Sequence, residues 1–121
     1  MNSIINWFEI PTQDLDRAVA FYEHALELSF YRETVSGIDM ALFPYEKPAT
    51  GGALVKADMF TPSDKGTVIY LHTPDLNAAL ERVTKAGGKT TFGPVVLPED
   101  IGSIALIIDS EGNRVGLHQP A

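Results

Sequence analysis

The chain repeats one strand, turn and helix pattern, and this repeat constrains the fold more than any other feature. Residues 7–22 form the first copy, and residues 68–80 form the second. The Asp-Leu pair that begins each helix recurs at a fixed offset, with Asp75 lying 61 residues after Asp14. Because an internal repeat changes the fold prediction for the whole chain, the sequence predicts a duplicated half-domain.

The first half reads as strand, helix and three further strands. The strands are expected over residues 4–10, 28–35, 38–43 and 51–56. Apolar residues at helical spacing predict a helix between the first two strands, with Thr12 or Asp14 as its N-cap. The apolar stripe of this helix consists of Leu15, Ala18, Val19, Tyr22 and Leu26.

The second half repeats that order. Strands are expected over residues 68–72, 89–92, 103–108 and 114–118, and a loop over residues 93–102. Thr73 is the expected N-cap of the second helix, with Pro74 at its first position, and Gly87 and Gly88 end it. We therefore predict an α+β fold of two tandem βαβββ modules, which form an open, curled mixed sheet with the helices on its outer face.

A polar segment with Pro62 and Gly66 separates the halves. We expect modules over residues 1–58 and 67–121, joined by a linker over residues 59–66. A chain of 121 residues that is 45% apolar suffices for one compact domain, so the two modules must share a core.

Composition excludes several classes of function. The net charge of −7 opposes binding to nucleic acid and favours a cationic ligand. Because the chain has no cysteine, disulfides and thiolate metal sites are excluded. No apolar stretch approaches the length that crosses a bilayer, and the N-terminus lacks a signal-peptide pattern. We expect a cytoplasmic protein without a membrane partner.

Four motifs carry a resemblance to a known family, at residues 7–11, 14–22, 85–89 and 109–118. Together they resemble the vicinal oxygen chelate superfamily, the group of glyoxalase I, bleomycin-resistance proteins and extradiol dioxygenases. The resemblance implies two βαβββ modules around an open cleft that a second subunit often completes. It therefore implies a homodimer with a small-molecule ligand.

Enzymes that this chain resembles hold a divalent metal through His, Gln or Glu on the first and last strand of each module. The matching positions here are Trp7, Gly52 or Ala53, Val68 and Gly116. Because none of these side chains binds a metal, the resemblance implies no metal and no cofactor here. Lyase or dioxygenase activity of the family's metal-dependent kind is disfavoured.

Strand alternation indicates which residues face the expected cleft. If Trp7 points inward, the residues that point toward the helices are Phe8, Ile10, Ile69, Leu71, Val115 and Leu117, which are all apolar. The cleft then receives the predicted ligand-binding residues Trp7, Glu9, Tyr70, His72 and His118. Aromatic walls with a few polar groups are typical of a small-molecule pocket. The leading hypothesis is metal-free binding of a small cationic or aromatic molecule.

Two other classes of function stay open. The first is a metal-independent lyase or isomerase that acts on a small carbonyl compound, with Glu9 as general base and His72 or His118 as proton donor. The second is a structural subunit that uses the cleft only for dimerisation. Some of the predicted ligand-binding residues also have a structural explanation. Trp7 can fill space in the core, and His118 can be a dimer contact.

A relocated metal site at Glu9, His72 and His118 is disfavoured. Relative to the family positions, His118 is shifted by two residues and His72 by four. At about 3.3 Å per residue, these shifts are about 7 and 13 Å along the strands.

Overall fold

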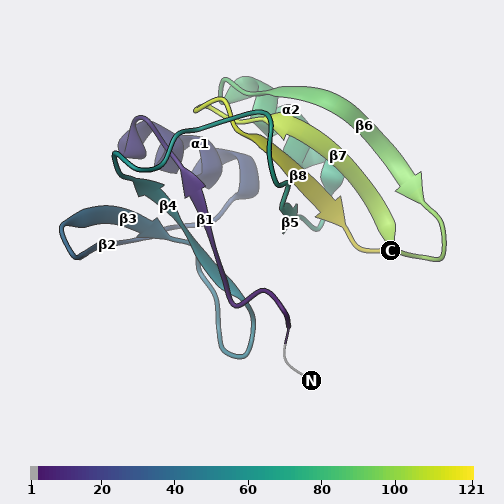
Figure 1. Cartoon of the computed structure of the whole chain (residues 1–121). Helices are drawn as coiled ribbons and strands as arrows, with labels where there is room; N and C mark the ends of the chain where they lie inside the picture. Colours follow the sequence, from purple (N-terminus) through teal and green to yellow (C-terminus); the bar gives the residue numbers. More distant parts are fainter. Residues whose placement is uncertain (1–2) are drawn as a thin grey trace.

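The computed structural model describes residues 3–121, and Figure 1 shows two modules with the same order of elements. The first module contains β1 (Trp7–Pro11), α1 (Leu15–Leu26), β2 (Tyr31–Val35), β3 (Ile38–Leu42) and β4 (Gly51–Lys56). The second contains β5 (Tyr70–His72), α2 (Leu76–Lys85), β6 (Lys89–Leu97), β7 (Gly102–Ile108) and β8 (Arg114–Gln119). This confirms the predicted α+β class and the repeated βαβββ order.

Each module folds into its own mixed sheet. The strand order is β1-β4-β3-β2 in the first sheet and β5-β8-β7-β6 in the second. The first strand of each module runs parallel to the last, and the other pairs are antiparallel. Among the helices and strands of residues 3–121, α1 and α2 are the pair whose backbones approach each other across the two modules.

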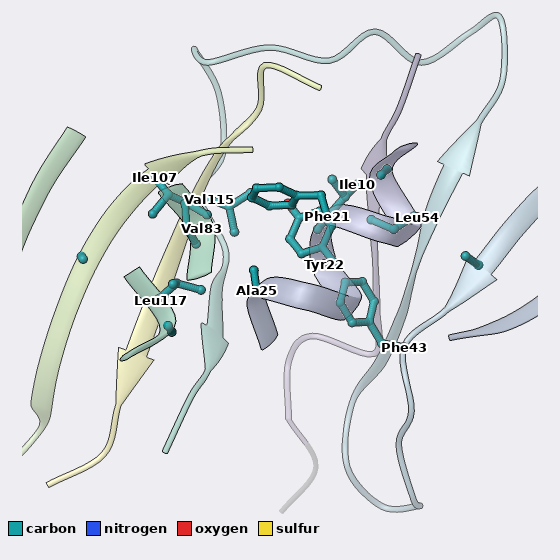
Figure 2. Close-up of a cluster of buried hydrophobic side chains, with 14 of the residues drawn as sticks. Ile10, Phe21, Tyr22, Ala25, Phe43, Leu54, Val83, Ile107, Val115 and Leu117 are labelled. Carbon is teal, nitrogen blue, oxygen red and sulfur yellow. The ribbon is translucent and has the colours of Figure 1, made fainter. Parts of the chain in front are cut away.

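The core lies where the two helices meet the two sheets. Figure 2 shows Phe21, Tyr22 and Ala25 of α1 between side chains of both modules. On one side are Ile10, Phe43 and Leu54, and on the other Val83, Ile107, Val115 and Leu117. The α1 stripe is confirmed, because Leu15, Ala18 and Tyr22 are buried and Val19 and Leu26 pack partly buried against them. Side chains from both halves therefore form one buried cluster.

Both helices begin at an aspartate. The Asp14 carboxylate accepts a hydrogen bond from the Arg17 backbone N–H at 3.0 Å, and Asp75 accepts one from Ala78 at 3.1 Å. The prediction that Thr73 caps α2 was wrong. Thr73 is buried, and its hydroxyl instead accepts a bond from the Asp75 backbone N–H. Asp75 stands where its carboxylate reaches the free N–H groups of the first turn, which is the geometry of an N-cap.

Strand lengths differ from the sequence prediction, and for three strands the residues with which they pair explain where they begin or end. β1 begins at Trp7, not residue 4, because Trp7 pairs with Gly51, the first residue of β4. β5 is likewise only three residues long and starts opposite Gly116. β6 continues to Leu97, although a loop was predicted from residue 93. Its register shifts between Phe92 and Val95, so a bulge carries the strand past Pro94.

The two helices contain 12 and 10 residues. No helix within residues 3–121 is long and apolar enough to cross a membrane.

Candidate functional site

The strand faces that point away from the helices carry the predicted site residues. In the first sheet, Phe8 and Ile10 pack toward the core, so Trp7 and Glu9 occupy the opposite face of β1. In the second sheet, Leu71 and Leu117 pack toward the core, which places their strand neighbours on the other face. These neighbours are Tyr70, His72, Gly116 and His118.

Trp7 is a surface aromatic residue rather than a buried one. It is 39% exposed, and its ring lies edge-on to Tyr45 with centroids 6.0 Å apart. Its indole Nε1 donates to Glu9 Oε2 at 3.3 Å. The carboxylate therefore holds the indole at its edge, and part of the ring stays exposed.

Tyr70 covers the backbone of β8 on the second sheet. It is 47% exposed, and a Cβ atom added at Gly116 would collide with its ring. His72 is exposed and pairs in register with His118. His118 is partly buried, and its Nε2 lies 2.6 Å from the Ile101 carbonyl oxygen, so the loop before β7 fixes this ring.

Two cavities open between the modules. The first, of about 430 Å³, is lined by Trp7 and Glu9 of β1 and by Arg114 of β8. The second, of about 650 Å³, is more apolar and is lined by Tyr70, His72 and side chains of the first module. The structure therefore brings Trp7 and Glu9 together in one cavity and Tyr70 and His72 in another.

Glu9 and the histidines do not share a cavity wall. Neither His72 nor His118 is among the residues that line the cavity of Glu9. General acid and base catalysis requires both groups within hydrogen-bonding reach of one substrate. The geometry within residues 3–121 therefore does not favour the acid and base pair that was considered from the sequence.

The positions that the resemblance assigns to metal ligands carry side chains that do not fit a metal. The register pairs Glu9 with Ala53 and Phe8 with Gly52, so Ala53 is the residue of β4 on the Trp7 face. The other positions are Trp7, Val68 and Gly116, and none of the four has a donor atom that a divalent cation prefers. Within residues 3–121, no three His, Asp or Glu side chains lie close enough together to hold a metal ion.

Sequence reasoning missed Arg114. It lies two residues before Gly116 and shares its strand face, because Arg114 pairs with Ile108 as Gly116 pairs with Leu106. The alternation that placed Gly116 and His118 on the cleft face also predicts Arg114 there. Among the described residues, Arg114 and Glu9 are thus the two charged ones that line the smaller cavity.

The turn between β7 and β8 contacts α1 of the other module. Glu111 of this turn accepts hydrogen bonds from the backbone N–H groups of Gln13 and Asp14, both at 2.9 Å. Its carboxylate also accepts bonds from Arg17 and from the Ser110 hydroxyl. Burial by itself raises the pKa of Glu111, but these hydrogen bonds outweigh burial and hold the pKa at about 2.

Asp109 of the same turn is bound from several sides. The Tyr22 hydroxyl donates to Asp109 Oδ2 at 2.6 Å, and the Asn113 side chain donates to the same oxygen at 3.0 Å. Asn113 also donates to the Pro11 carbonyl oxygen at 2.8 Å. This turn therefore fixes the end of β1 relative to the start of β8, which are the two walls of the smaller cavity.

The family assignment follows from sequence and fold together. The chain belongs to the Glyoxalase/Bleomycin resistance protein/Dioxygenase superfamily, whose family model matches residues 4–117. A glyoxylase-like domain-containing protein from Didymella fabae is 30% identical over 114 residues, which is 90% of this chain and 88% of the relative.

Solved structures show the same fold. TnmS3, described as an antibiotic binding protein from Streptomyces sp. CB03234, is 25% identical with a TM-score of 0.68, and the match covers 98% of this chain and 97% of that one. The fosfomycin resistance protein FosX from Listeria monocytogenes is 15% identical with a TM-score of 0.69, over 100% of this chain and 94% of that one. At that identity, FosX supports the fold alone.

Proposed function

We propose that this protein binds a small aromatic molecule on its open sheet faces, without a metal. The observation that carries the proposal is the pairing of exposed Trp7 with Glu9 on the wall of a cavity of about 430 Å³. Small-molecule sites typically combine aromatic walls with a few oriented polar groups in cavities of this size. The likeness to TnmS3, an antibiotic binding protein, supports the same class of function.

A positive charge on the ligand is part of the proposal. The chain carries a net charge of −7, which raises the local concentration of cations at its surface. Glu9 is exposed, and its carboxylate accepts only the long bond from Trp7 among the hydrogen bonds of residues 3–121. An ammonium group beside the indole would bind the carboxylate and the ring together.

We also propose that two copies of this chain form the working protein. Large apolar side chains are exposed on the outer strands of both sheets, including Tyr31 and Val35 on β2 and Phe92 and Val96 on β6. Large apolar side chains exposed on an edge strand favour contact with a second chain. Light scattering coupled to size-exclusion chromatography tests the dimer, and a monomer at micromolar concentration would contradict it.

The binding proposal is tested through fluorescence, because Trp7 is the only tryptophan in the chain. We expect planar aromatic cations to change its emission with saturation, and Glu9→Gln to weaken binding of the cations more than of neutral analogues. Asp16→Asn is the matched control, because Asp16 is an exposed acid on α1 outside this cavity. Absence of any saturable signal and of any calorimetric heat, with a folded protein, would overturn the proposal.

A further inference from the structure

Within residues 3–121, Arg114 differs from the other arginines in that its side chain forms no ion pair. Arg17 pairs with Glu111, Arg32 with Asp16 and Arg82 with Glu27. Within residues 3–121, Arg114 forms no ion pair within 4.0 Å, and its Nε is buried without a hydrogen-bond partner. A buried donor left without an acceptor costs about 1–3 kcal/mol.

The position of Arg114 is fixed by its backbone. Its N–H donates to the Ser63 carbonyl oxygen at 3.3 Å, which ties the start of β8 to the segment between β4 and β5. The preceding residue, Asn113, accepts a bond from the Ser63 backbone N–H and donates to Pro11. The guanidinium therefore belongs to a built wall of the cavity rather than to a free loop.

Glu9 and Trp7 line the same cavity from the other sheet. No ion pair joins Glu9 to Arg114 within 4.0 Å in the described part of the chain, so the two charges do not neutralise each other. A guanidinium binds a carboxylate through two parallel hydrogen bonds, and a carboxylate binds an ammonium group. The indole of Trp7 offers an aromatic face to the same space.

These three groups select one ligand chemistry. A ligand with only a positive charge would bind Glu9 and leave Arg114 without a partner, and one with only a negative charge would bind Arg114 and leave Glu9 without one. A molecule with both charges satisfies both walls. We propose that the cavity between the modules binds an aromatic zwitterion, with its carboxylate on Arg114, its ammonium group on Glu9 and its ring against Trp7. This inference rests on the proposed function and narrows its ligand class.

The test compares three probes of the same shape by isothermal titration calorimetry at neutral pH. 4-(Aminomethyl)benzoate carries both charges, benzylamine carries only the ammonium group, and 4-methylbenzoate carries only the carboxylate. We expect the zwitterion to bind wild-type protein about tenfold or more tightly than either analogue, which corresponds to about 1.4 kcal/mol.

Two variants assign each charge to its residue. Arg114→Met should abolish the advantage of the zwitterion over benzylamine, and Glu9→Gln should abolish its advantage over 4-methylbenzoate. Arg114→Lys keeps the charge but lacks the planar fork, so it should restore only part of the affinity. Circular dichroism checks that each variant is folded, and the comparison of probes on wild-type protein stands without any variant.

Equal affinity of wild-type protein for benzylamine and the zwitterion would overturn the inference of a zwitterionic ligand. The proposed function would stand in that case, because an aromatic molecule would still bind at Trp7. Failure of all three probes to bind would also overturn the inference. The proposed function is then judged separately by the planar aromatic cations.

Discussion

Glu111 and Arg17 join the two modules through a two-point ion pair. The Arg17 Nε donates to Glu111 Oε2 at 2.8 Å, and its Nη2 donates to Oε1 at 3.0 Å. Glu111 follows β7 in the second module, whereas Arg17 lies in the first turn of α1 in the first. Because the same carboxylate accepts the N–H groups of Gln13 and Asp14, a turn of one module caps the helix of the other.

The Glu111 carboxylate makes stability depend on acid pH. Its pKa is lowered from 4.5 to about 2, so the folded state favours the ionised form. The contribution to stability is full above about pH 4.5 and is lost as the pH falls toward 2. We expect Glu111→Gln to lower the free energy of unfolding at pH 7 by about 2 kcal/mol. This value is smaller than the pKa shift alone implies, because Arg17 is half exposed and water screens its charge. Urea denaturation at pH 7 and pH 3 measures the difference.

The exposed pair of Arg32 and Asp16 provides the control for that experiment. Its side chains are 50% and 85% exposed, so water screens the interaction. Asp16→Asn should leave both the stability and its acid dependence close to those of wild type. If Glu111→Gln showed the same pH profile as wild type, the link between this carboxylate and acid stability would be wrong.

Tyr22 provides a second test of the contact between modules. Its hydroxyl donates to buried Asp109 at 2.6 Å, and burial followed by the nearby Asp109 charge raises the Tyr22 pKa well above 10. Tyr22→Phe keeps the ring but leaves the carboxylate short of one donor. We expect a loss of about 1–3 kcal/mol in the free energy of unfolding. Tyr31→Phe, at a side chain that is 67% exposed, should change little.

Local patterns in the sequence predicted the repeat, the α1 stripe and β4 with its observed bounds. These local patterns did not predict contacts between residues that are distant in the sequence. The contacts of Glu111 and Asp109 with α1 span 87 to 98 residues, so nothing within the Asp109–Asn113 turn indicates them. The α2 N-cap failed for a different reason, since Thr73 and Asp75 both carry capping side chains and only the backbone decides between them.

The candidate site was predicted in part by strand alternation, which depends only on the period of two residues. The same alternation places Arg114 on this face. A charged residue at the start of a strand, however, usually indicates a strand end that is exposed to solvent, so the sequence alone does not single out Arg114. Its unpaired and buried Nε is visible only after the segment between β4 and β5 packs beside β8.

Gly52 and Gly116 lie under aromatic rings and should respond differently to a methyl group. A Cβ atom at Gly52 would collide with the ring of Phe8. That ring packs against Phe43 in the core, with the two ring centroids 5.3 Å apart. We expect Gly52→Ala to cost about 1–3 kcal/mol, the usual range for overpacking. Gly116→Ala collides with Tyr70, which is 47% exposed and can turn toward solvent. Thermal unfolding should therefore show the larger loss for Gly52→Ala.

Divalent metals should neither bind stoichiometrically nor stabilise the protein. Trp7, Ala53, Val68 and Gly116 offer no donor atoms, and Tyr70 fills the space beside Gly116 into which a ligand side chain would extend. A metal that bound the folded state would raise the melting temperature by mass action. We expect no shift with nickel, zinc, manganese or iron(II), and no metal in elemental analysis of the untagged protein. Stoichiometric metal that is lost in Glu9→Gln or His118→Ala would instead show that these side chains converge in solution, and would return metal-dependent lyase chemistry to consideration.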